Sequence, residues 1–394
     1  MGRPIMPSRS PSALIFGTIF LDLVGFGIVI PVLPLYAERF GASPLVIGCL
    51  LGIYSAMQCL FAPILGRLSD RVGRRPVLLL SVIGTSAGFL LMGAANSLWL
   101  LFAARVIDGI TGGNISTAQA YIADITPPEH RSRGMGLIGA AFGLGFIFGP
   151  AIGGLLSHVS LAAPFFFAAF LAAANAVAIY CLLPESLPVE RRNQARARVS
   201  FSALVQQVRQ RPLGIILTAY FFTTVSFSLL TATYALFTER RFGYTAAQTG
   251  YIFAGQGLLG AVIQGGLLGW LVKTFGDKKL VMAGTATLAL SLFLLPMGTT
   301  TAFLLLVTTG VAIGHSLALA PLNGLASTSV AGDAQGRVLG MMQSAASFAR
   351  IVGPVLGGWL LNYDLLHLAT AFGRTAYLAG GVVALLAVGL AIAL

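Results

Sequence analysis

The stretch Gly66-Arg67-Leu68-Ser69-Asp70-Arg71-Val72-Gly73-Arg74-Arg75 separates two long apolar runs. So many charges cannot lie in hydrocarbon, because no water there would solvate them, and the stretch therefore predicts a tight turn at a membrane surface. Its four arginines indicate the cytoplasmic surface, where Lys and Arg concentrate in membrane proteins. Gly66 and Gly73 permit close approach of the backbone, and Asp70 can pair with an arginine or accept from backbone N–H groups. The turn is either a topological corner or part of a cytoplasmic gate.

The composition indicates a membrane protein. Of 394 residues, 57% are hydrophobic and 9% are charged, and the mean hydropathy is +0.88. Soluble domains carry about 25% charged residues. The apolar runs are too long and too numerous to form one buried core, so they are interpreted as membrane spans.

The distribution of basic charge gives the orientation of the spans. Of the 24 Lys and Arg, Arg105 and Arg350 lie within apolar runs, and four lie in loops assigned to the outside. The remaining 18 fall in segments assigned to the cytoplasm, as the positive-inside rule requires. The net charge of +12 therefore sets topology and gives no reason to expect a nucleic-acid partner. We expect a multi-pass protein of the inner (plasma) membrane with both termini in the cytoplasm.

Twelve apolar segments predict an all-α polytopic membrane protein with twelve transmembrane helices. Each segment has about 20 residues or more, enough to cross about 30 Å of hydrocarbon. The expected helices are 12–35, 44–66, 76–95, 98–122, 133–157, 161–183, 212–237, 246–271, 279–297, 301–325, 336–361 and 372–394.

An internal repeat divides the chain into two six-helix halves, 1–183 and 212–394, joined by a cytoplasmic linker over 184–211. Residues of the same type recur at offsets of 202 to 204, which indicates duplication. The pairs are Phe40-Gly41 with Phe242-Gly243, Gly48 with Gly250, Gly66 with Gly269, Gly73 with Gly276, Arg133 with Arg337, Gly136 with Gly340, Gly149-Pro150 with Gly353-Pro354, and Gly153-Gly154 with Gly357-Gly358. Transporters built from parallel repeats bind substrate near the midplane between the repeats.

Small residues in helix five predict close helix packing. Gly145, Gly149, Gly153 and Gly154 open a groove for another helix, and Pro150 permits a kink. The second half repeats the pattern with Gly353 and Pro354.

Asp22 lies ten residues into the first helix and is a candidate proton carrier. A charged aspartate there costs about 2.5–3.5 kcal/mol on insertion scales, so the side chain must be neutral, paired or near water. The alternative is a purely structural hydrogen bond between helices. Arg105 and Asp108 are spaced i, i+3 on one face of helix four and predict an ion pair, which protonation of Asp108 could switch.

Four further polar residues in the spans are candidates for the substrate cavity. Gln58 and Gln264 occupy corresponding helices and contact either substrate or a neighbouring helix. His315 and Arg350 lie near mid-depth in the second half. His315 is either a functional residue or a satisfied hydrogen-bonding residue, and Arg350 either helps close the cavity against Asp22 and Asp108 or binds an anionic group.

Asp124 and Arg133 flank a Pro-Pro loop and are candidates for the charge network of the cytoplasmic gate, with Asp70 and Arg74. Cys49, Cys59 and Cys181 lie in apolar runs without metal-ligand spacing, so we expect packing roles, no metal and no cofactor. The sequence contains no nucleophile–base pair in a polar setting, so we do not expect an enzyme. It also contains no phosphate-binding loop followed by Lys-Ser/Thr, so we do not expect an ATP-driven pump. The expected partners are protons, a small-molecule substrate and lipid, with the chain a monomer.

Several motifs together resemble the bacterial tetracycline efflux antiporters, in the drug:proton antiporter branch of the major facilitator superfamily. The resemblance runs over nearly the whole chain and includes the helix-five glycines and the helix-four run Arg105, Gly109 and Gly112-Gly113. It also includes Asp22 with Pro31 and Pro34, Leu68-Ser69-Asp70-Arg71-Val72-Gly73-Arg74-Arg75-Pro76, Tyr121-Ile122-Ala123-Asp124 and Leu236-Phe237-Thr238-Glu239-Arg240-Arg241-Phe242-Gly243. The resemblance implies the major facilitator fold, proton coupling through Asp22 and Arg105, and a cytoplasmic gate at Asp70 and Arg74.

The chain departs from the tetracycline transporters at three polar positions. That family carries an aspartate in helix three, a histidine in helix eight and an aspartate in helix nine, where this chain has Gly88, Gly260 and Thr287. We therefore expect proton-coupled export of another amphipathic compound. The alternative is an uncoupled facilitator or an anion transporter of the same fold that uses Arg350.

Overall fold

The computed structural model describes residues 11–126, 131–192, 211–330, 335–367 and 371–394. These residues form helices and turns, with no strand in the described ranges. The helices of the first half are α1 (Pro11–Glu38), α2 (Pro44–Val72), α3 (Arg74–Gly93), α4 (Leu98–Thr111), α5 (Asn114–Ile125), α6 (Arg131–Ser157) and α7 (Ala163–Leu182). Those of the second half are α9 (Leu213–Phe242), α10 (Ala246–Val262), α11 (Leu268–Phe275), α12 (Asp277–Leu294), α13 (Thr301–Thr328), α14 (Gln335–Leu366) and α15 (Arg374–Ile392). Most of the predicted linker, 193–210, lies outside the described residues.

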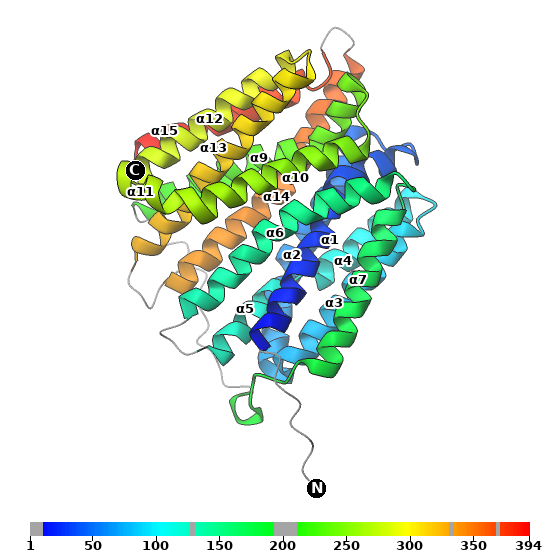
Figure 1. Cartoon of the computed structure of the whole chain (residues 1–394), viewed down its shortest axis with the longest axis vertical. Coiled ribbons are helices and arrows are strands. Elements are labelled where there is room, and N and C mark those ends of the chain that lie inside the picture. Colours follow the sequence, from blue (N-terminus) through cyan, green and yellow to red (C-terminus); the bar gives the residue numbers. More distant parts are fainter. Residues whose placement is uncertain (1–10, 127–130, 193–210, 331–334, 368–370) are drawn as a thin grey trace.

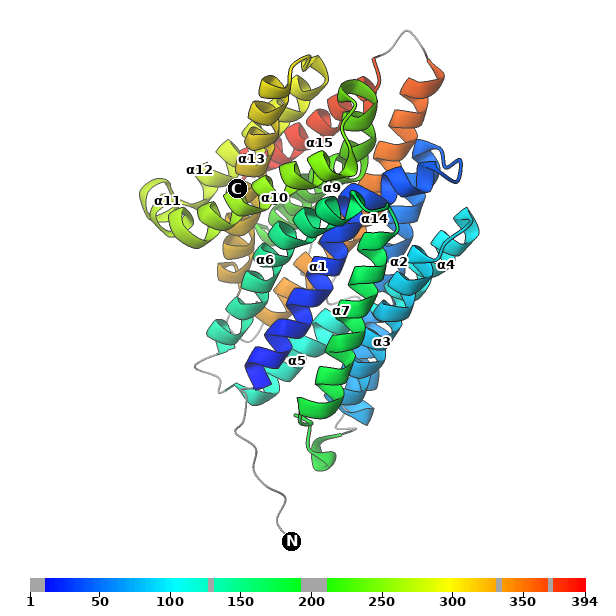
Figure 2. The ribbon, with the colours of Figure 1, turned by 45° about the vertical axis from the view of Figure 1, so that its right-hand side comes forward.

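The structure confirms the predicted fold class. Eleven continuous helical runs in the described residues are long and apolar enough to cross a membrane. The twelfth predicted span is made of α4 and α5 together. Figure 1 and Figure 2 show the two groups of helices side by side, with α1 to α7 forming one bundle and α9 to α15 the other.

Two predicted helices are interrupted. The expected helix 98–122 breaks at Gly112-Gly113, where the side chain of Gln58 donates to the carbonyl oxygen of Gly112 at 2.8 Å. The break brings these glycines against α2, since a Cβ on Gly113 would lie 3.0 Å from Cα of Ala62. The expected helix 246–271 contains a π-helical turn, Ile263–Leu267. Hydropathy could not locate either interruption, because both lie inside continuous apolar runs.

The halves meet through glycines at one end of the bundle, which we call the closed end. There, α2 packs on α14 and α6 packs on α10. A Cβ on Gly48 would overlap the carbonyl oxygen of Pro354 and lie 3.2 Å from Cα of Gly358. At the symmetric contact, a Cβ on Gly250 would overlap the carbonyl oxygen of Pro150 and lie 3.0 Å from Cα of Gly154. Only glycine allows backbones this close.

The same helices diverge toward the turn at residues 66–75, which we call the open end. Gly66 lies 18 residues, or five helical turns, beyond Gly48 and therefore on the same face of α2. A Cβ on Gly66 would have no atom within 4 Å, and the same holds for Gly340, which lies 18 residues before Gly358 on α14. The close approach expected of Gly66 is therefore not made in this structure, because the halves are apart at that end.

An ion pair joins the halves at the closed end. Arg240 at the end of α9 donates from Nη2 to Oε1 of Glu38, at the end of α1, at 2.7 Å. The Arg240 guanidinium also lies over the ring of Phe372, 4.8 Å from its centroid. The pair therefore adds a charged contact to the glycine contacts that hold this end closed.

Candidate functional site

The charged turn forms a cluster around the buried side chain of Arg74. The guanidinium of Arg74 is 1% exposed and lies 2.6 Å from Oδ1 of Asp70 and 3.2 Å from Oδ2 of Asp124. Its Nη1 also donates to the hydroxyl of Ser69 at 2.5 Å. The cluster thus joins α2, α3 and α5 at the open end. Arg133 lies in the first turn of α6, and the surroundings of its side chain lie outside what the structure describes.

Glu185 completes the cluster and was not among the residues predicted from the sequence. Its carboxylate accepts from the backbone N–H groups of Arg74 at 2.8 Å and Arg75 at 3.2 Å, the first residues of α3. It also accepts from the N–H groups of Ser186 and Leu187, each at 3.0 Å. A carboxylate at a helix N-terminus satisfies N–H groups that have no partner within the helix and interacts favourably with the helix dipole. The start of the linker is therefore attached to the turn.

Gly73 is required by both conformation and space in this cluster. Its φ of 113° is one that L side chains rarely adopt, and a Cβ would overlap Oε2 of Glu185. We expect Gly73→Ala to displace the carboxylate and to destabilise the protein by about 1–3 kcal/mol, the range for a strained backbone position. Thermal unfolding in detergent would measure the loss. Gly66→Ala is the matched control, because its Cβ meets open space. Equal stability of the two variants would contradict this role of Gly73.

A second cluster lies inside the first half, around Arg105. Arg105 is 1% exposed and donates from Nη1 to Oδ2 of Asp108 at 3.0 Å, as the i, i+3 spacing predicts. Its guanidinium lies over the ring of Tyr54, 4.3 Å from the centroid. Asp22 of α1 is half-buried and interacts electrostatically with Asp108, with Asn114 of α5 beside it. We call Asp22, Tyr54, Arg105 and Asp108 the acid–base cluster.

Gln58 supports the acid–base cluster. Its Nε2 donates to the hydroxyl of Tyr54 at 3.2 Å as well as to Gly112, so its described contacts are within the first half. Tyr54 was not among the residues predicted from the sequence, although its place one turn before Gln58 on α2 was a usable signal. Gln264, the corresponding residue of the second half, is exposed on the π-helical turn.

The second half presents Arg350 and His315. Arg350 of α14 donates from Nη2 to the hydroxyl of Ser347 at 3.2 Å and interacts electrostatically with Tyr54 across the interface of the halves. The ring of His315 stacks on that of Phe227, with 3.7 Å between centroids, and its Nδ1 has no hydrogen-bond partner among the described residues. Tyr54 is therefore the member of the acid–base cluster that interacts with both Arg105 of its own half and Arg350 of the other half.

The predicted fifth helix is α6, and its glycines place it against α1 and α10. A Cβ on Gly145 would lie 3.0 Å from the backbone of Leu23, and Gly149 and Gly153 approach α1 in the same way. Gly154 instead approaches α10. In the second half, Gly353 approaches α9, where a Cβ would lie 2.8 Å from the backbone nitrogen of Leu229. Pro150 and Pro354 lie inside their helices at these crossings.

The three departures from the tetracycline pattern occupy different surroundings. Gly88 packs on α4, because a Cβ there would lie 2.9 Å from Cβ of Asp108. A Cβ on Gly260 would lie 3.3 Å from the hydroxyl of Ser316. Thr287 is half-buried and donates to the carbonyl oxygen of Ala283. No group of three or more His, Cys, Asp or Glu in the described residues could hold a metal ion.

Comparison with known proteins identifies the family. The family model described as Major Facilitator Superfamily matches residues 15–273 and 216–394. Tetracycline resistance protein, class C, of Escherichia coli is 37% identical, with 89% of each chain covered. The chain belongs to the major facilitator superfamily. Another relative of this superfamily member, tetracycline resistance protein, class D, of Salmonella ordonez, is 33% identical over 90% of each chain.

More distant relatives agree with this assignment. Multidrug resistance protein 2 of Bacillus subtilis (strain 168) is 29% identical, with 93% of this chain and 92% of the relative covered. The crystal structure of the human organic anion transporter MFSD10 is 26% identical and covers 99% of this chain and 100% of its own, with a TM-score of 0.72. A variant of the nucleoside transporter NupG shares the fold, with a TM-score of 0.80 and 14% identity over 98% of this chain and 99% of its own. This superfamily member is therefore a multi-pass membrane transporter and not an enzyme.

Proposed function

We propose that this transporter exports an amphipathic small molecule in exchange for protons, with its termini and the 66–75 turn in the cytoplasm. The acid–base cluster carries this proposal, because two carboxyl groups and an arginine lie together inside the membrane-spanning part of one half. Intramembrane ionisable groups are costly and are a mark of proton and substrate pathways. The tetracycline and multidrug resistance relatives support export of a drug-like compound.

Alternating access explains how the two ends would serve transport. With the turn in the cytoplasm, the structure corresponds to a state that is open inward, because the halves touch at the Glu38 end and separate at the Gly66 end. The substrate would enter the space between the halves, where Tyr54 of the first half and Arg350 of the second interact electrostatically. Protonation of Asp22 or Asp108 would remove a negative charge from the acid–base cluster and weaken its attraction to the guanidinium of Arg105. The resulting rearrangement would bias the halves toward the opposite state.

Tetracycline is not the substrate that this site favours. Where the tetracycline transporters have an aspartate in helix three, Gly88 leaves no room for a side chain beside Asp108. The other two polar groups are also absent, since Gly260 and Thr287 occupy their positions. An amphipathic compound bound without those groups is therefore the better candidate.

A second candidate function is uncoupled transport of an organic anion centred on Arg350. Among the described residues no carboxylate pairs with Arg350, so its charge is available to an anionic group. The structural relative MFSD10 is an organic anion transporter. In this case collapse of the pH gradient would leave transport unchanged, and Arg350→Gln would abolish transport of acidic compounds alone.

The test of proton coupling is Asp22→Asn in proteoliposomes loaded with acidic, neutral and cationic amphipathic dyes. We expect this variant to keep downhill exchange of its dye and to lose uphill transport driven by a pH gradient, by at least about tenfold, because an amide cannot carry the proton. Asp277→Asn, at the start of α12, is the matched control and should transport as the wild type does. Uphill transport at the wild-type level in Asp22→Asn would remove Asp22 from the coupling role.

A further inference from the structure

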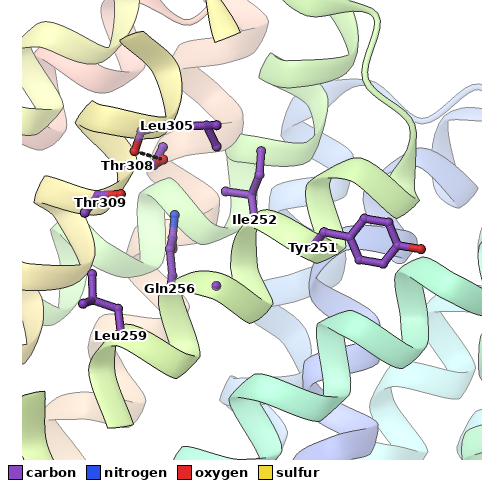
Figure 3. Close-up of a pocket in the computed structure, with 8 residues that line it drawn as sticks. Tyr251, Ile252, Gln256, Leu259, Leu305, Thr308 and Thr309 are labelled. Atoms are coloured by element: carbon purple, nitrogen blue, oxygen red, sulfur yellow. Dashed lines mark hydrogen bonds between the residues drawn. The ribbon is translucent and has the colours of Figure 1, made fainter. Parts of the chain in front are cut away.

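A groove on the lateral surface of the second half lies between α10 and α13. Its cavity has a volume of about 360 Å³ and is lined by Tyr251, Ile252, Gly255, Gln256, Leu259, Leu305, Thr308 and Thr309. We call it the α10–α13 groove, and Figure 3 shows its side chains. A volume in this range suits a small ligand.

The groove opens to the lipid and not to the space between the halves. Tyr251 and Leu305 on its rim are 48% and 44% exposed. The side of α10 that meets the first half carries Gly250 and Gly257 instead, and a Cβ on Gly257 would lie 2.7 Å from the carbonyl oxygen of Phe146. A ligand in the groove would therefore not occupy the central site proposed above.

The amide of Gln256 gives the groove its chemistry. In Figure 3 its side chain rises from α10 toward α13, between Ile252 and Thr309. Both Nε2 and Oε1 are buried, and neither has a hydrogen-bond partner among the described residues. Thr308 is no partner, because its hydroxyl donates to the carbonyl oxygens of Leu304 at 2.8 Å and Leu305 at 3.1 Å in its own helix. An unpaired buried amide is destabilising, and hydrocarbon offers no water to satisfy it.

The depth of Gln256 narrows the choice of ligand. The run Ala246–Phe275 has 30 residues, a length of about 45 Å against about 30 Å of hydrocarbon. Gln256 is ten residues from the start of this run, so it lies about 7 Å inside the hydrocarbon if the run is centred in the bilayer. The glycerol and ester groups of lipids lie at the hydrocarbon boundary and do not reach this depth. An amphiphile dissolved in the hydrocarbon does reach this depth. Its own polar group can supply the hydrogen-bond donor and acceptor that the amide of Gln256 lacks.

We propose that the α10–α13 groove binds an uncharged amphiphile that carries an amide or hydroxyl group and reaches the site from the hydrocarbon. The donor and acceptor of Gln256 pair with the acceptor and donor of such a group. The side chains of Ile252, Leu259 and Leu305 surround its apolar part. This site is separate from the central one and does not depend on the coupling mechanism.

Photolabelling of the protein in nanodiscs tests the proposal. The probe is a medium-chain primary fatty amide that carries a diazirine, and its comparator is the same chain ending in a methyl group. We expect the amide to label peptides containing Tyr251–Leu259 or Leu305–Thr309 at least about fivefold more than the comparator, because two hydrogen bonds to Gln256 are gained. Equal labelling by the two probes would overturn the proposal.

Two variants and a control attribute the labelling to the groove. Gln256→Leu should reduce labelling by the amide to that of the comparator, and Leu305→Trp should do so by filling the cavity while the amide of Gln256 remains. Gln264→Leu, in the same helical run, should leave groove labelling unchanged. The thermal unfolding midpoint of each variant is measured first, so that only folded protein is compared. Full labelling in Gln256→Leu would overturn the proposal.

Two further experiments are needed. One distinguishes a bound lipid from a dissolved amphiphile, and the other distinguishes the groove proposal from the proton-coupling proposal. A phosphatidylglycerol with a diazirine in its acyl chain should label the groove independently of Gln256, and labelling that requires Gln256 would assign the site to lipid instead. Asp22→Asn should keep groove labelling while it loses uphill transport. Failure of the groove proposal and failure of the proton-coupling proposal are thus distinguishable.

Discussion

Replacing both Gly48 and Gly250 by valine is expected to separate the two halves at the closed end and to reduce transport at least about tenfold. Each added side chain would overlap a backbone carbonyl oxygen of the opposite half, that of Pro354 or that of Pro150. A backbone atom cannot rotate away as a side chain can, so the overlap is relieved only if the helices move apart. Overpacking costs about 1–3 kcal/mol at each site, and the two sites together shift a two-state equilibrium by more than tenfold.

The pair is chosen because the two contacts are copies of one another. Gly48 meets Gly358 between α2 and α14, and Gly250 meets Gly154 between α10 and α6. The repeat offset relates Gly48 to Gly250 and Gly154 to Gly358. The double substitution therefore loosens both sides of the interface equally, and the state closed at this end loses stability relative to the opposite state.

Spin labels give the measurement for this prediction. After removal of Cys49, Cys59 and Cys181, labels at Arg39 and Leu365 report the separation of α1 and α14 at the closed end. We expect the double variant to shift the distance distribution to longer values. The matched control is Gly17→Val with Gly389→Val, because a Cβ at either position meets no atom within 4 Å. An unchanged distribution with full transport would show that these contacts do not hold the end closed.

The repeat was the most informative feature of the sequence, and it also explains what the sequence could not give. Matching glycines at offsets of 202 to 204 predicted two equivalent halves. The offsets carry no information about which glycines touch one another. That pairing depends on which end of the bundle is closed, and one sequence encodes both the open and the closed states.

Glu185 shows a different limit of sequence reasoning. It stands 111 positions after Arg74, in a polar segment whose sequence predicts only a linker. Its role depends on the chain returning to the start of α3, where Gly73 leaves the N–H groups without a side-chain cap. A side-chain carboxylate that accepts from distant backbone N–H groups follows no spacing rule, whereas the Arg105–Asp108 pair is local and follows directly from helix geometry.

Arg105→Leu is expected to destabilise the protein by about 3–5 kcal/mol, the usual cost of removing one partner from a buried ion pair. Arg105 and Asp108 are 1% and 5% exposed, so the carboxylate left behind could not be solvated by bulk water. The ring of Tyr54 would also lose the cation above it. Unfolding in detergent, followed by tryptophan fluorescence, measures the change. Arg374→Leu, at the exposed start of α15, is the control and should change stability by less than about 0.5 kcal/mol.

The double variant Arg105→Leu with Asp108→Leu separates the structural role of the pair from its role in transport. Removing both charges leaves no unpaired ion, so we expect stability to return to within about 1–2 kcal/mol of the wild type. Uphill transport should not return, because the proposed mechanism requires a carboxyl group that responds to protons and an arginine that responds to the carboxyl. A stable double variant with wild-type uphill transport would show that the pair is a structural contact and would leave Asp22 as the remaining acid of the cluster. A stable variant without uphill transport would place the pair in the coupling mechanism itself.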